Sequence, residues 1–565
     1  MPQHHHKGKK FENFIFNILQ SRSKKLVVIL LVIFALIGTI MMLPTKVVLA
    51  RMLPGKSANT FSVYVTTPSG SSIAQTQKVV QCVDNILTKE KAVTDIESFL
   101  GQGAPLDYAG LVKGSGMKKG ERFAEMVVNL TDKHEREEKS FLMVHRLRPI
   151  IKKSCEPLVK DSVIQMVEMP AGPPTLASLV VEVYGDVNAK VAQVAKGVAH
   201  VLKNTKKVVD VDVMSETPFP EYKIVPITEK ITRSGLSVDQ VNKILYLAFK
   251  GMVVSVKNTI QLNDQVGIFV ALSPETKKLD DNSLSALQTK LSSLSLMNKQ
   301  GMMIPLTEVV SIKKVPSNRA IYHKDLKTMI NVTAEADNES QVYPLLDARE
   351  KMIKYFTKKG YEVSKVPGIS TYMFDLKLKD KKTGDQYLLR WDGEMKVTLD
   401  TFRDLGAAFI AALILIYLLM VIYYKSFAIS SIILGGSFLS IIGVILGHWV
   451  ADLVTTDTFF LTATSLIGFI ALMGISSRNS LLLVDFTKDL IINKNMEKKR
   501  AIAIASATRA KPILLTAIAI ILGSALLASD PIFGGLGVAL ISGTVVAVII
   551  SIIFVPVLMD NTKSI

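Results

Sequence analysis

The chain has 565 residues, of which 49% are hydrophobic and 21% are charged, and its formal net charge at pH 7 is +18. The apolar residues gather in long uncharged blocks on either side of a polar middle region, which is typical of membrane proteins rather than soluble enzymes. Much of the positive charge lies beside these blocks, and the sequence has no aromatic and basic module of the kinds that bind RNA or DNA. Nucleic-acid binding is therefore not expected.

Residues 1–25 are predicted to be a cytoplasmic or interfacial segment. Residues 10–22, which include three phenylalanines, fit either an interfacial helix or a disordered tail with chance aromatics. The apolar block at residues 26–45 is predicted to be the first transmembrane helix. It is long for the core of a signal peptide and no small-residue cleavage site follows it, so we expect it to be retained.

The polar middle region begins with a repeated pattern of strand, helix and strand. Period-2 stretches and helical stretches alternate twice within residues 46–170. This order matches a split βαβ or ferredoxin-like unit, in which two passes form one antiparallel sheet backed by two helices. The predicted segments are 61–67, 72–88, 93–100, 123–130, 139–153 and 163–169.

The same pattern resumes after the linker at residues 170–174, but its second pass is delayed. Its first pass covers 179–213, and the second covers 329–366 with a last strand near 361–366. Residues between these passes are predicted to be an inserted domain at 218–325. The second subdomain therefore comprises residues 175–217 and 326–398.

The C-terminal part contains five further apolar blocks, each close to the roughly 20 residues that cross a bilayer. Lysine and arginine gather near the N-terminus and in the connection at residues 487–511, which predicts both termini in the cytoplasm and the large domain outside. The predicted transmembrane helices are 403–424, 426–450, 458–486, 512–529 and 534–558.

Arg478 is the only charged residue in the run from Thr458 to Val484. A charge at membrane depth normally marks an ion pathway and pairs with an opposite charge. No acid lies beside it, so the pairing carboxylate is expected on a neighbouring helix or on another chain.

Several motifs resemble those of a known transporter family. They are MLPG at 52–55, PSGSSIAQT at 68–76, EMPAGPPTLASLVVEVYG at 168–185, GISSRNSLLLVDF at 474–486, KPILLTAIAIILG at 511–523 and FVPVL at 554–558. On these residues, and over nearly its whole length, the chain resembles the C-terminal half of a resistance-nodulation-division (RND) efflux pump. It is most similar to the hydrophobe/amphiphile, AcrB-like multidrug branch.

This resemblance implies a fold class and an activity. The implied fold is a multi-pass α-helical membrane protein with six transmembrane helices and a large α+β periplasmic region, made of two ferredoxin-like porter subdomains and an inserted docking domain. The implied activity is proton-driven efflux of hydrophobic or amphiphilic small molecules across the bacterial inner membrane, and no enzymatic chemistry, cofactor or bound metal is expected. The implied partners are a trimeric assembly, a periplasmic adaptor (membrane fusion) protein and an outer-membrane channel.

The sequence departs from the family at its centre. The family's proton-carrying pair of aspartates lies on a central helix of the N-terminal half, whereas this chain has Ser477 and Arg478, where the C-terminal half usually carries a lysine. Arginine does not lose its proton in proteins, so Arg478 is predicted to be a fixed counter-ion. The acids are then expected on a separate N-terminal-half subunit.

Asn479 and Thr516 match family positions near the proton relay. They either orient Arg478 through hydrogen bonds or have structural roles, Thr516 by bonding its own helix backbone and Asn479 by joining helices. Asp485 lies near the cytoplasmic end of the same helix as Arg478, which favours an interfacial charge over a proton site.

Three other functions remain open: heavy-metal efflux of the copper or silver type, a SecD/SecF-like secretion helper, and a scaffold or truncated half without transport. Methionines that could bind Cu(I) favour the first, although methionine also fills cores. Cys82 and Cys155 lie on or beside two predicted helices; spacing alone does not pair them, and two buried thiols are slightly favoured over a disulfide. The methionines are Met166, Met169, Met214, Met252, Met297, Met302 and Met303.

Overall fold

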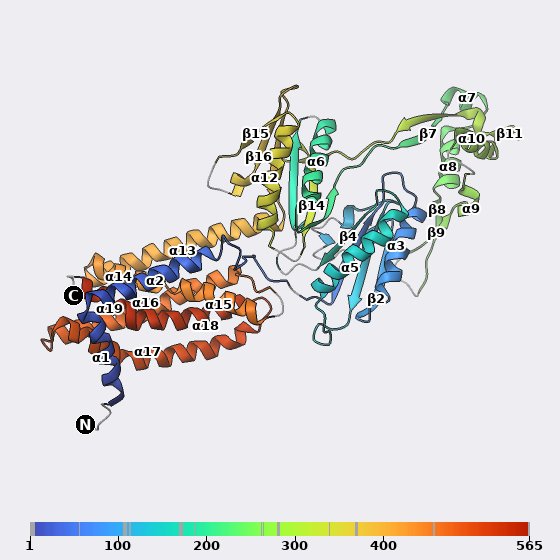
Figure 1. The fold of residues 1–565 in the computed structure, drawn as a ribbon. Coiled ribbons are helices and arrows are strands. Elements are labelled where there is room, and N and C mark those ends of the chain that lie inside the picture. The colour runs from blue at the N-terminus through green and yellow to red at the C-terminus, as the bar shows by residue number, and fades with distance from the viewer. Residues whose placement is uncertain are drawn as a thin grey trace. The chain divides into compact units, whose positions relative to one another are not determined.

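The computed structural model of the chain forms two compact units (Figure 1). Unit 1 comprises Met1–Ser215 and Ile321–Ile565, and unit 2 comprises Glu216–Ala320. Unit 1 holds the membrane helices and two large sheets. The structure describes residues 6–55, 57–105, 110–111, 115–168, 172, 175–186, 188–260, 263, 265–279, 283–337, 340–367, 371–455 and 458–562.

The described residues contain six helical spans long and apolar enough to cross a membrane, as the sequence predicts. These spans pack into one bundle (Figure 1). Small residues let them approach closely: a Cβ on Gly443 would lie 2.5 Å from the carbonyl oxygen of Ser542. The spans are α2 (Arg22–Met41), α13 (Glu394–Tyr424), α14 with α15 (Phe427–Phe438, Ile441–Val454), α16 (Ala463–Ile492), α17 (Lys498–Ala528), and α18 with η4 and α19 (Gly534–Ile549, Ile550–Phe554, Val555–Asn561).

Several of these helices extend beyond the apolar blocks. α13 begins at Glu394, directly after a strand, and α17 begins at Lys498 and continues through Pro512. An apolar block marks only the part of a helix at membrane depth, whereas the backbone hydrogen bonds continue into polar surroundings. Residues 498–511, which the sequence assigns to a connection, therefore form the first turns of α17.

The N-terminal segment forms an amphipathic helix, α1 (His6–Gln20). Its apolar side buries Ile15, Ile18 and Leu19 against α17 and α19. At the start of α2, Lys25 Nζ lies 2.7 Å from Asp560 Oδ2 near the other end of the chain. Of the two alternatives for residues 10–22, the helix is the one found.

The first sheet of unit 1 is antiparallel with the order β2-β3-β1-β4, and helices α3 and α5 cover one face. This is the order of a split βαβ unit. The inward residues of β1 and β3, among them Val63, Val65 and Met126, form its core with the two helices. The elements are β1 (Thr60–Thr66), α3 (Ile73–Leu87), β2 (Val93–Leu100), η1 (Ser115–Met117), β3 (Phe123–Leu130), α5 (Ser140–Cys155), η2 (Glu156–Leu158) and β4 (Val163–Glu168).

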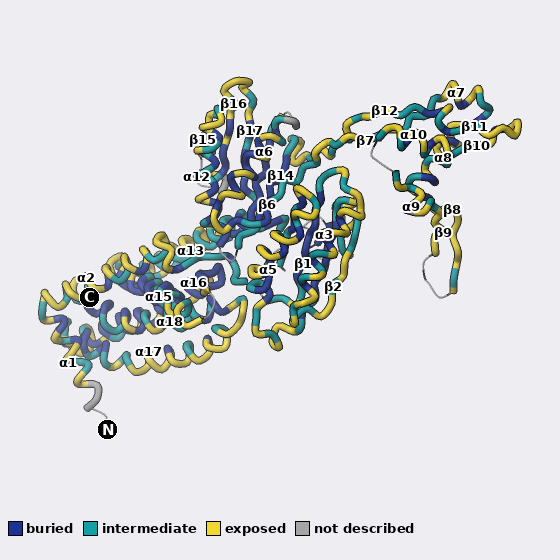
Figure 2. Tube along the Cα trace, turned by 45° about the vertical axis from the view of Figure 1, so that its right-hand side comes forward, coloured by how far each residue is buried: buried dark blue, intermediate teal, exposed yellow. Residues whose placement is uncertain are grey.

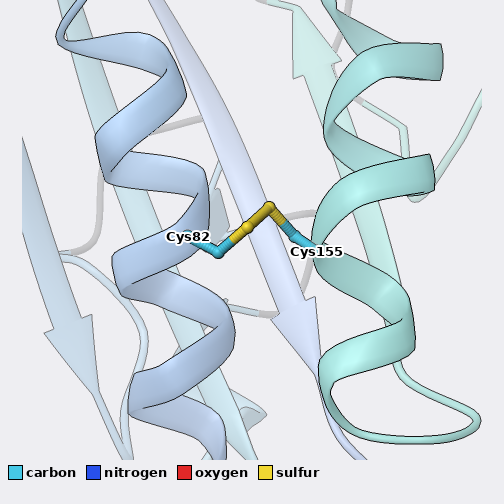
Figure 3. The surroundings of a disulfide bond; sticks show 2 residues. All are labelled: Cys82 and Cys155. Carbon is cyan, nitrogen blue, oxygen red and sulfur yellow. A yellow bond between two sulfur atoms is a disulfide. The ribbon is translucent and has the colours of Figure 1, made fainter.

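A disulfide joins the two helices of this sheet. Cys82 on α3 and Cys155 at the end of α5 are bonded, with their Cα atoms 5.6 Å apart (Figure 3). The preference for two free thiols is therefore wrong. Sequence spacing does not show that the two helices lie side by side on one face of the sheet, which brings the cysteines together.

The second sheet has the order β13-β14-β5-β17-β16-β15, with β6 also paired to β14. Helices α6 and α12 cover its apolar face, where Leu179, Val181 and Val332 are buried. Of the predicted linker at residues 170–174, all but Gly172 lie outside the described residues. The elements are β5 (Leu179–Gly185), α6 (Asn188–Lys203), β6 (Val208–Val213), β13 (Tyr322–Lys324), β14 (Lys327–Ala336), α12 (Val342–Lys358), β15 (Tyr361–Lys365), η3 (Thr371–Phe374), β16 (Leu376–Asp380) and β17 (Gln386–Asp392).

This sheet is larger than the sequence predicts. The strand expected near 361–366 is β15, but it lies at the sheet edge, and β17 takes the place beside β5. The chain turns back between β16 and β17 at Gly384, whose φ of 76° suits a glycine. Because β17 leads directly into α13, the second sheet is joined to the membrane bundle by a continuous strand and helix.

Unit 2 enters and leaves through the paired strands β7 (Pro220–Pro226) and β12 (Val310–Pro316). Its small core includes Ile231, Val241 and Leu306. Strands β8 (Met252–Lys257) and β9 (Val266–Val270) form a hairpin that is largely exposed (Figure 2). The remaining elements are α7 (Thr228–Arg233), α8 (Val238–Phe249), α9 (Pro274–Lys277), α10 (Leu284–Ser292), β10 (Ser295–Met297), β11 (Met303–Pro305) and α11 (Leu306–Val309).

Candidate functional site in the membrane helices

Helix α16 carries the candidate site and is fixed firmly at its start. Thr462 caps the helix by accepting a hydrogen bond from the Ser465 backbone N–H at 3.3 Å. The hydroxyl of Ser465 lies 2.8 Å from His448 Nε2 on α15, and both side chains are buried. Further along, Gly468 allows close contact with Leu536 and Ala539 of α18. The position and rotation of α16 in the bundle are thus determined by packing.

One face of α16 is left open along its length. Ile467, Gly474, Arg478 and Leu482 are exposed on this face, and a Cβ on Gly474 would meet no atom within 4 Å. The neighbouring side is closed: Ser477 is buried, and its hydroxyl lies 2.7 Å from the Met473 carbonyl oxygen and 3.1 Å from Ser437 Oγ on α14. We call Ile467, Gly474, Arg478 and Leu482 the open face of α16.

Arg478 is the charged group on this face. Within the part of the chain that the structure describes, it has neither a hydrogen bond nor an ion pair. Placing a lone guanidinium at the centre of a membrane helix costs about 2.5 to 3.5 kcal/mol on insertion scales. Arginine cannot relieve this cost by losing its proton. Among the described residues, no acid of these helices pairs with the guanidinium on the open face.

The structure does not bring Asn479 and Thr516 into contact with Arg478. Asn479 is buried and makes no hydrogen bond among the described residues. The Thr516 hydroxyl donates to the Ile513 carbonyl oxygen at 2.9 Å, within its own helix. That bond is the structural alternative foreseen for Thr516. Relay roles for both residues remain predictions.

Two polar residues, one on this helix and one beside it, were not foreseen as part of the site. Arg509 lies within α17, with its guanidinium carbon 5.0 Å from the centre of the Phe486 ring, and its buried Nε has no hydrogen-bond partner in the described structure. Asp485 accepts a hydrogen bond from the Tyr424 hydroxyl at 2.7 Å. The sequence predicts that Arg509 lies in a connection and that Asp485 is an interfacial charge. Which helices lie next to these two residues is seen only once the helices are packed.

Comparison with known proteins shows which family the chain resembles. The model of the AcrB/AcrD/AcrF family matches residues 4–364 and 371–560. The swarming motility protein SwrC of Bacillus subtilis (strain 168) is 22% identical over 565 residues, which cover 98% of this chain and 47% of SwrC. The multidrug export protein AcrF of Escherichia coli (strain K12) is 22% identical over 569 residues, covering 98% of this chain and 49% of AcrF.

Proteins named for metal resistance or metal efflux are also among the similar proteins. The cobalt-zinc-cadmium resistance protein CzcA of Cupriavidus metallidurans is 22% identical over 347 residues, covering 61% of this chain and 29% of CzcA. A crystal structure of a heavy metal efflux pump superposes with a TM-score of 0.70 at 18% identity, covering 98% of this chain and 52% of that one. The chain thus spans about half the length of the relatives that it matches over its whole length.

Six helical spans long and apolar enough to cross a membrane, joined to large α+β sheets, are the features of a polytopic membrane protein. The family model covers nearly all of the chain, and the chain belongs to the AcrB/AcrD/AcrF family of RND efflux transporters.

Proposed function

We propose that this chain is one half of a proton-driven RND efflux permease. In this proposal Arg478 is the fixed counter-ion for carboxylates on the complementary half. The observation that carries the proposal is the open face of α16, on which Arg478 is exposed at membrane depth without a partner in the described chain. Asn479 and Thr516 are proposed to orient Arg478 once the complementary half is present.

The chemistry follows from the fixed charge of arginine. A guanidinium close to a carboxylate favours its ionised form, and the carboxylate binds a proton more readily when the guanidinium moves away. Two positions of Arg478 relative to an acidic pair would therefore correspond to two protonation states. Proton entry would bias this two-state element and drive the porter subdomains through their transport cycle.

The proposed assembly has three levels. A separate N-terminal-half subunit carries the acidic pair, and three such heterodimers form a trimer in the bacterial inner membrane. Both termini lie in the cytoplasm, and the sheets and unit 2 lie in the periplasm as two porter subdomains and a docking domain, where a periplasmic adaptor protein and an outer-membrane channel bind. The distribution of Lys and Arg supports this orientation.

For the substrate, we propose hydrophobic or amphiphilic small molecules, as the name of AcrF indicates multidrug export for that relative. Heavy-metal efflux is the second candidate, since CzcA is by name a cobalt-zinc-cadmium resistance protein and the superposed structure is that of a heavy metal efflux pump. Met166 is buried in the core of the first sheet, whereas Met297 and Met303 pair across strands β10 and β11 and are exposed together with Met302. Exposed thioethers are the chemistry that Cu(I) would use.

The test is efflux by cells that express the chain with its presumed complementary half, measured with a dye, a bile salt and Cu(I). We expect Arg478→Ala to abolish proton-dependent efflux while the two halves still co-purify. Arg478→Lys should retain part of the activity, and Arg500→Ala, at an exposed arginine near the start of α17, should resemble the wild type. Unchanged efflux with Arg478→Ala would refute the counter-ion role.

The same experiment separates the rival functions. A secretion helper would change protein export but not the dye or Cu(I) content of the cells, and a scaffold would support assembly without any efflux. A chain that purifies alone and binds no complementary half would refute the heterodimer.

A further inference from the structure

Asp485 is an acid on the same helix and the same side as Arg478. It lies two helical turns further on, about 10 Å along the axis at a rise of ~1.5 Å per residue. It is half-buried, and its Oδ1 accepts a hydrogen bond from the Tyr424 hydroxyl of α13 at 2.7 Å. The same hydroxyl lies 3.4 Å from the Leu481 carbonyl oxygen. Tyr424, on the neighbouring helix α13, therefore fixes the position of the Asp485 carboxylate.

Other acids near this end of the bundle, where both termini lie, have different surroundings (Figure 1). Asp560 is in an ion pair with Lys25 at 2.7 Å. Asp489 is exposed and accepts a hydrogen bond from Asn493 Nδ2 at 2.7 Å. Asp485 has no ion pair among the described residues, and its partner is a neutral phenol. An acid of this kind can take up a proton without breaking an ion pair, and its hydrogen bond from Tyr424 survives because the second oxygen receives the proton.

The titratable and charged groups around Asp485 come from three helices, α16, α13 and α17. On its own helix are Arg478, Lys488 and Asp489; Lys488 Nζ lies 5.0 Å from the Tyr424 ring centre. Tyr424 and the exposed Lys425 belong to the end of α13, and Arg509 of α17 stacks on Phe486 next to Asp485. The packed segments α14, α18 and η4 carry no titratable side chain, and His448 and Asp452 of α15 lie toward the opposite end of the bundle.

We propose that Asp485 is a second proton-binding site of the transporter, through which protons pass between the Arg478 region and the termini-bearing side of the membrane. A proton adds to the free oxygen of the carboxylate, and the neutral acid later returns it to water at that side. Tyr424 is a positioning residue that holds Oδ1. This inference rests on the proposed proton coupling, and it assigns to the present half a titratable group that Arg478 cannot provide.

If the role of this pair were purely structural, the hydrogen bond between Asp485 and Tyr424 would only hold α13 and α16 together. The two roles predict opposite results for two near-isosteric variants. Asp485→Asn keeps an oxygen that accepts the Tyr424 hydrogen bond but cannot titrate, whereas Tyr424→Phe removes the bond and keeps the carboxylate. Asp489→Asn, one turn further along α16, is the matched control.

The assay is proton flux and efflux by the assembled full-length complex in proteoliposomes, as a function of pH. We expect Asp485→Asn to lower proton-coupled efflux at least tenfold with normal assembly, Tyr424→Phe to retain turnover with a shifted pH profile, and Asp489→Asn to match the wild type. If Asp485→Asn transports like the wild type while Tyr424→Phe impairs assembly, the hydrogen bond only holds the two helices together and the proposal is wrong.

Infrared difference spectroscopy of the full chain in lipid provides a readout that does not need transport. Acidification should produce a protonated-carboxyl band that is absent from Asp485→Asn and present in Asp489→Asn. A spectrum unchanged by Asp485→Asn would overturn the proposal. Failure of the wild-type complex to move protons would instead contradict the proposed function, and the spectrum would then decide whether Asp485 titrates.

Discussion

Arg148 and Asp210 form an ion pair that joins the two sheets of unit 1. Arg148 Nε on α5 donates to Asp210 Oδ2 on β6 at 3.0 Å, and both side chains are buried. Asp210 also accepts hydrogen bonds from Lys152 Nζ at 3.0 Å and from the Met166 backbone N–H at 3.1 Å. A second bond links Arg148 to Asp337 at 2.9 Å. The first and second sheets are therefore connected by a buried charged contact.

Removing one side of this pair should destabilise unit 1 strongly. Arg148→Gln leaves Asp210 buried with less compensation, and loss of one partner of a buried ion pair typically costs about 3 to 5 kcal/mol. The melting temperature of the purified chain should fall accordingly. Arg146→Gln is the matched control on the same helix, because Arg146 is exposed and its bonds to Glu90 and Glu138 should contribute no more than about 1 kcal/mol. Equal effects of the two variants on the melting temperature would contradict a strongly stabilising role for the Arg148–Asp210 ion pair.

Glu168, at the end of β4, should make stability depend on pH. Burial raises the pKa of Glu168 from 4.5 to about 7; Arg148 and Arg51 act against this rise, and Glu335 and Asp337 add to it. Because the folded-state pKa lies above the unfolded value, the stability contribution is complete below about pH 4.5 and is lost as the pH rises through about 7.

The change that tests this dependence is Glu168→Gln. The melting temperature of the wild type should fall between about pH 5 and pH 8. Glu168→Gln should lack the part of this fall that comes from ionisation of Glu168. Glu97→Gln, at an exposed position on β2, should leave that dependence intact. An unchanged pH profile in Glu168→Gln would show that this carboxyl group does not titrate in the range.

The Cys82–Cys155 disulfide should contribute substantially to the first sheet. The two cysteines are 73 positions apart, and a cross-link over a loop of that size typically stabilises a fold by about 2 to 5 kcal/mol. Reductant should lower the denaturation midpoint of the wild type but have no effect on a Cys82→Ala/Cys155→Ala double variant. A wild type insensitive to a reductant that demonstrably frees both thiols would exclude this contribution.

Gly474 provides a test of the open face of α16. Its Cβ position is empty, so Gly474→Leu should leave folding of the chain unchanged but prevent the proposed docking of the complementary half. Gly443→Ala should behave in the opposite way, since its Cβ would overlap the Ser542 backbone, and overpacking typically costs about 1 to 3 kcal/mol. Thermal stability and co-purification of the two halves distinguish these outcomes. Normal co-purification of Gly474→Leu would mean that the complementary half binds elsewhere.

The elements that the sequence predicts well are those with strong periodicity. The six spans and the first sheet follow from apolar blocks and alternating strands. Strands β16 and β17 were missed, because their hairpin depends on the turn at Gly384 and comes after the ferredoxin-like pattern is complete. The disulfide was missed for a similar reason: it depends on helix neighbours rather than on spacing.

The candidate site, too, could be predicted from the sequence only in part. Arg478 is visible in the sequence as a lone charge within an apolar run, but its exposure follows from which sides of α16 are packed. The bond between Tyr424 and Asp485 joins two helices far apart in the sequence, so no local pattern could indicate it.

The insertion of unit 2 has a consequence for the order of folding. Strands β6 and β14 are neighbours in the second sheet, yet the whole of unit 2 separates them along the chain. Bringing distant segments together costs loop-closure entropy, which increases with the length of the loop. Pairing of β7 with β12 places Pro220 opposite Pro316 and brings the two ends of the insert to the spacing of adjacent strands. If unit 2 folds first, β14 would reach β6 across a short connection, and the loop-closure cost of the sheet that leads into the membrane would be smaller.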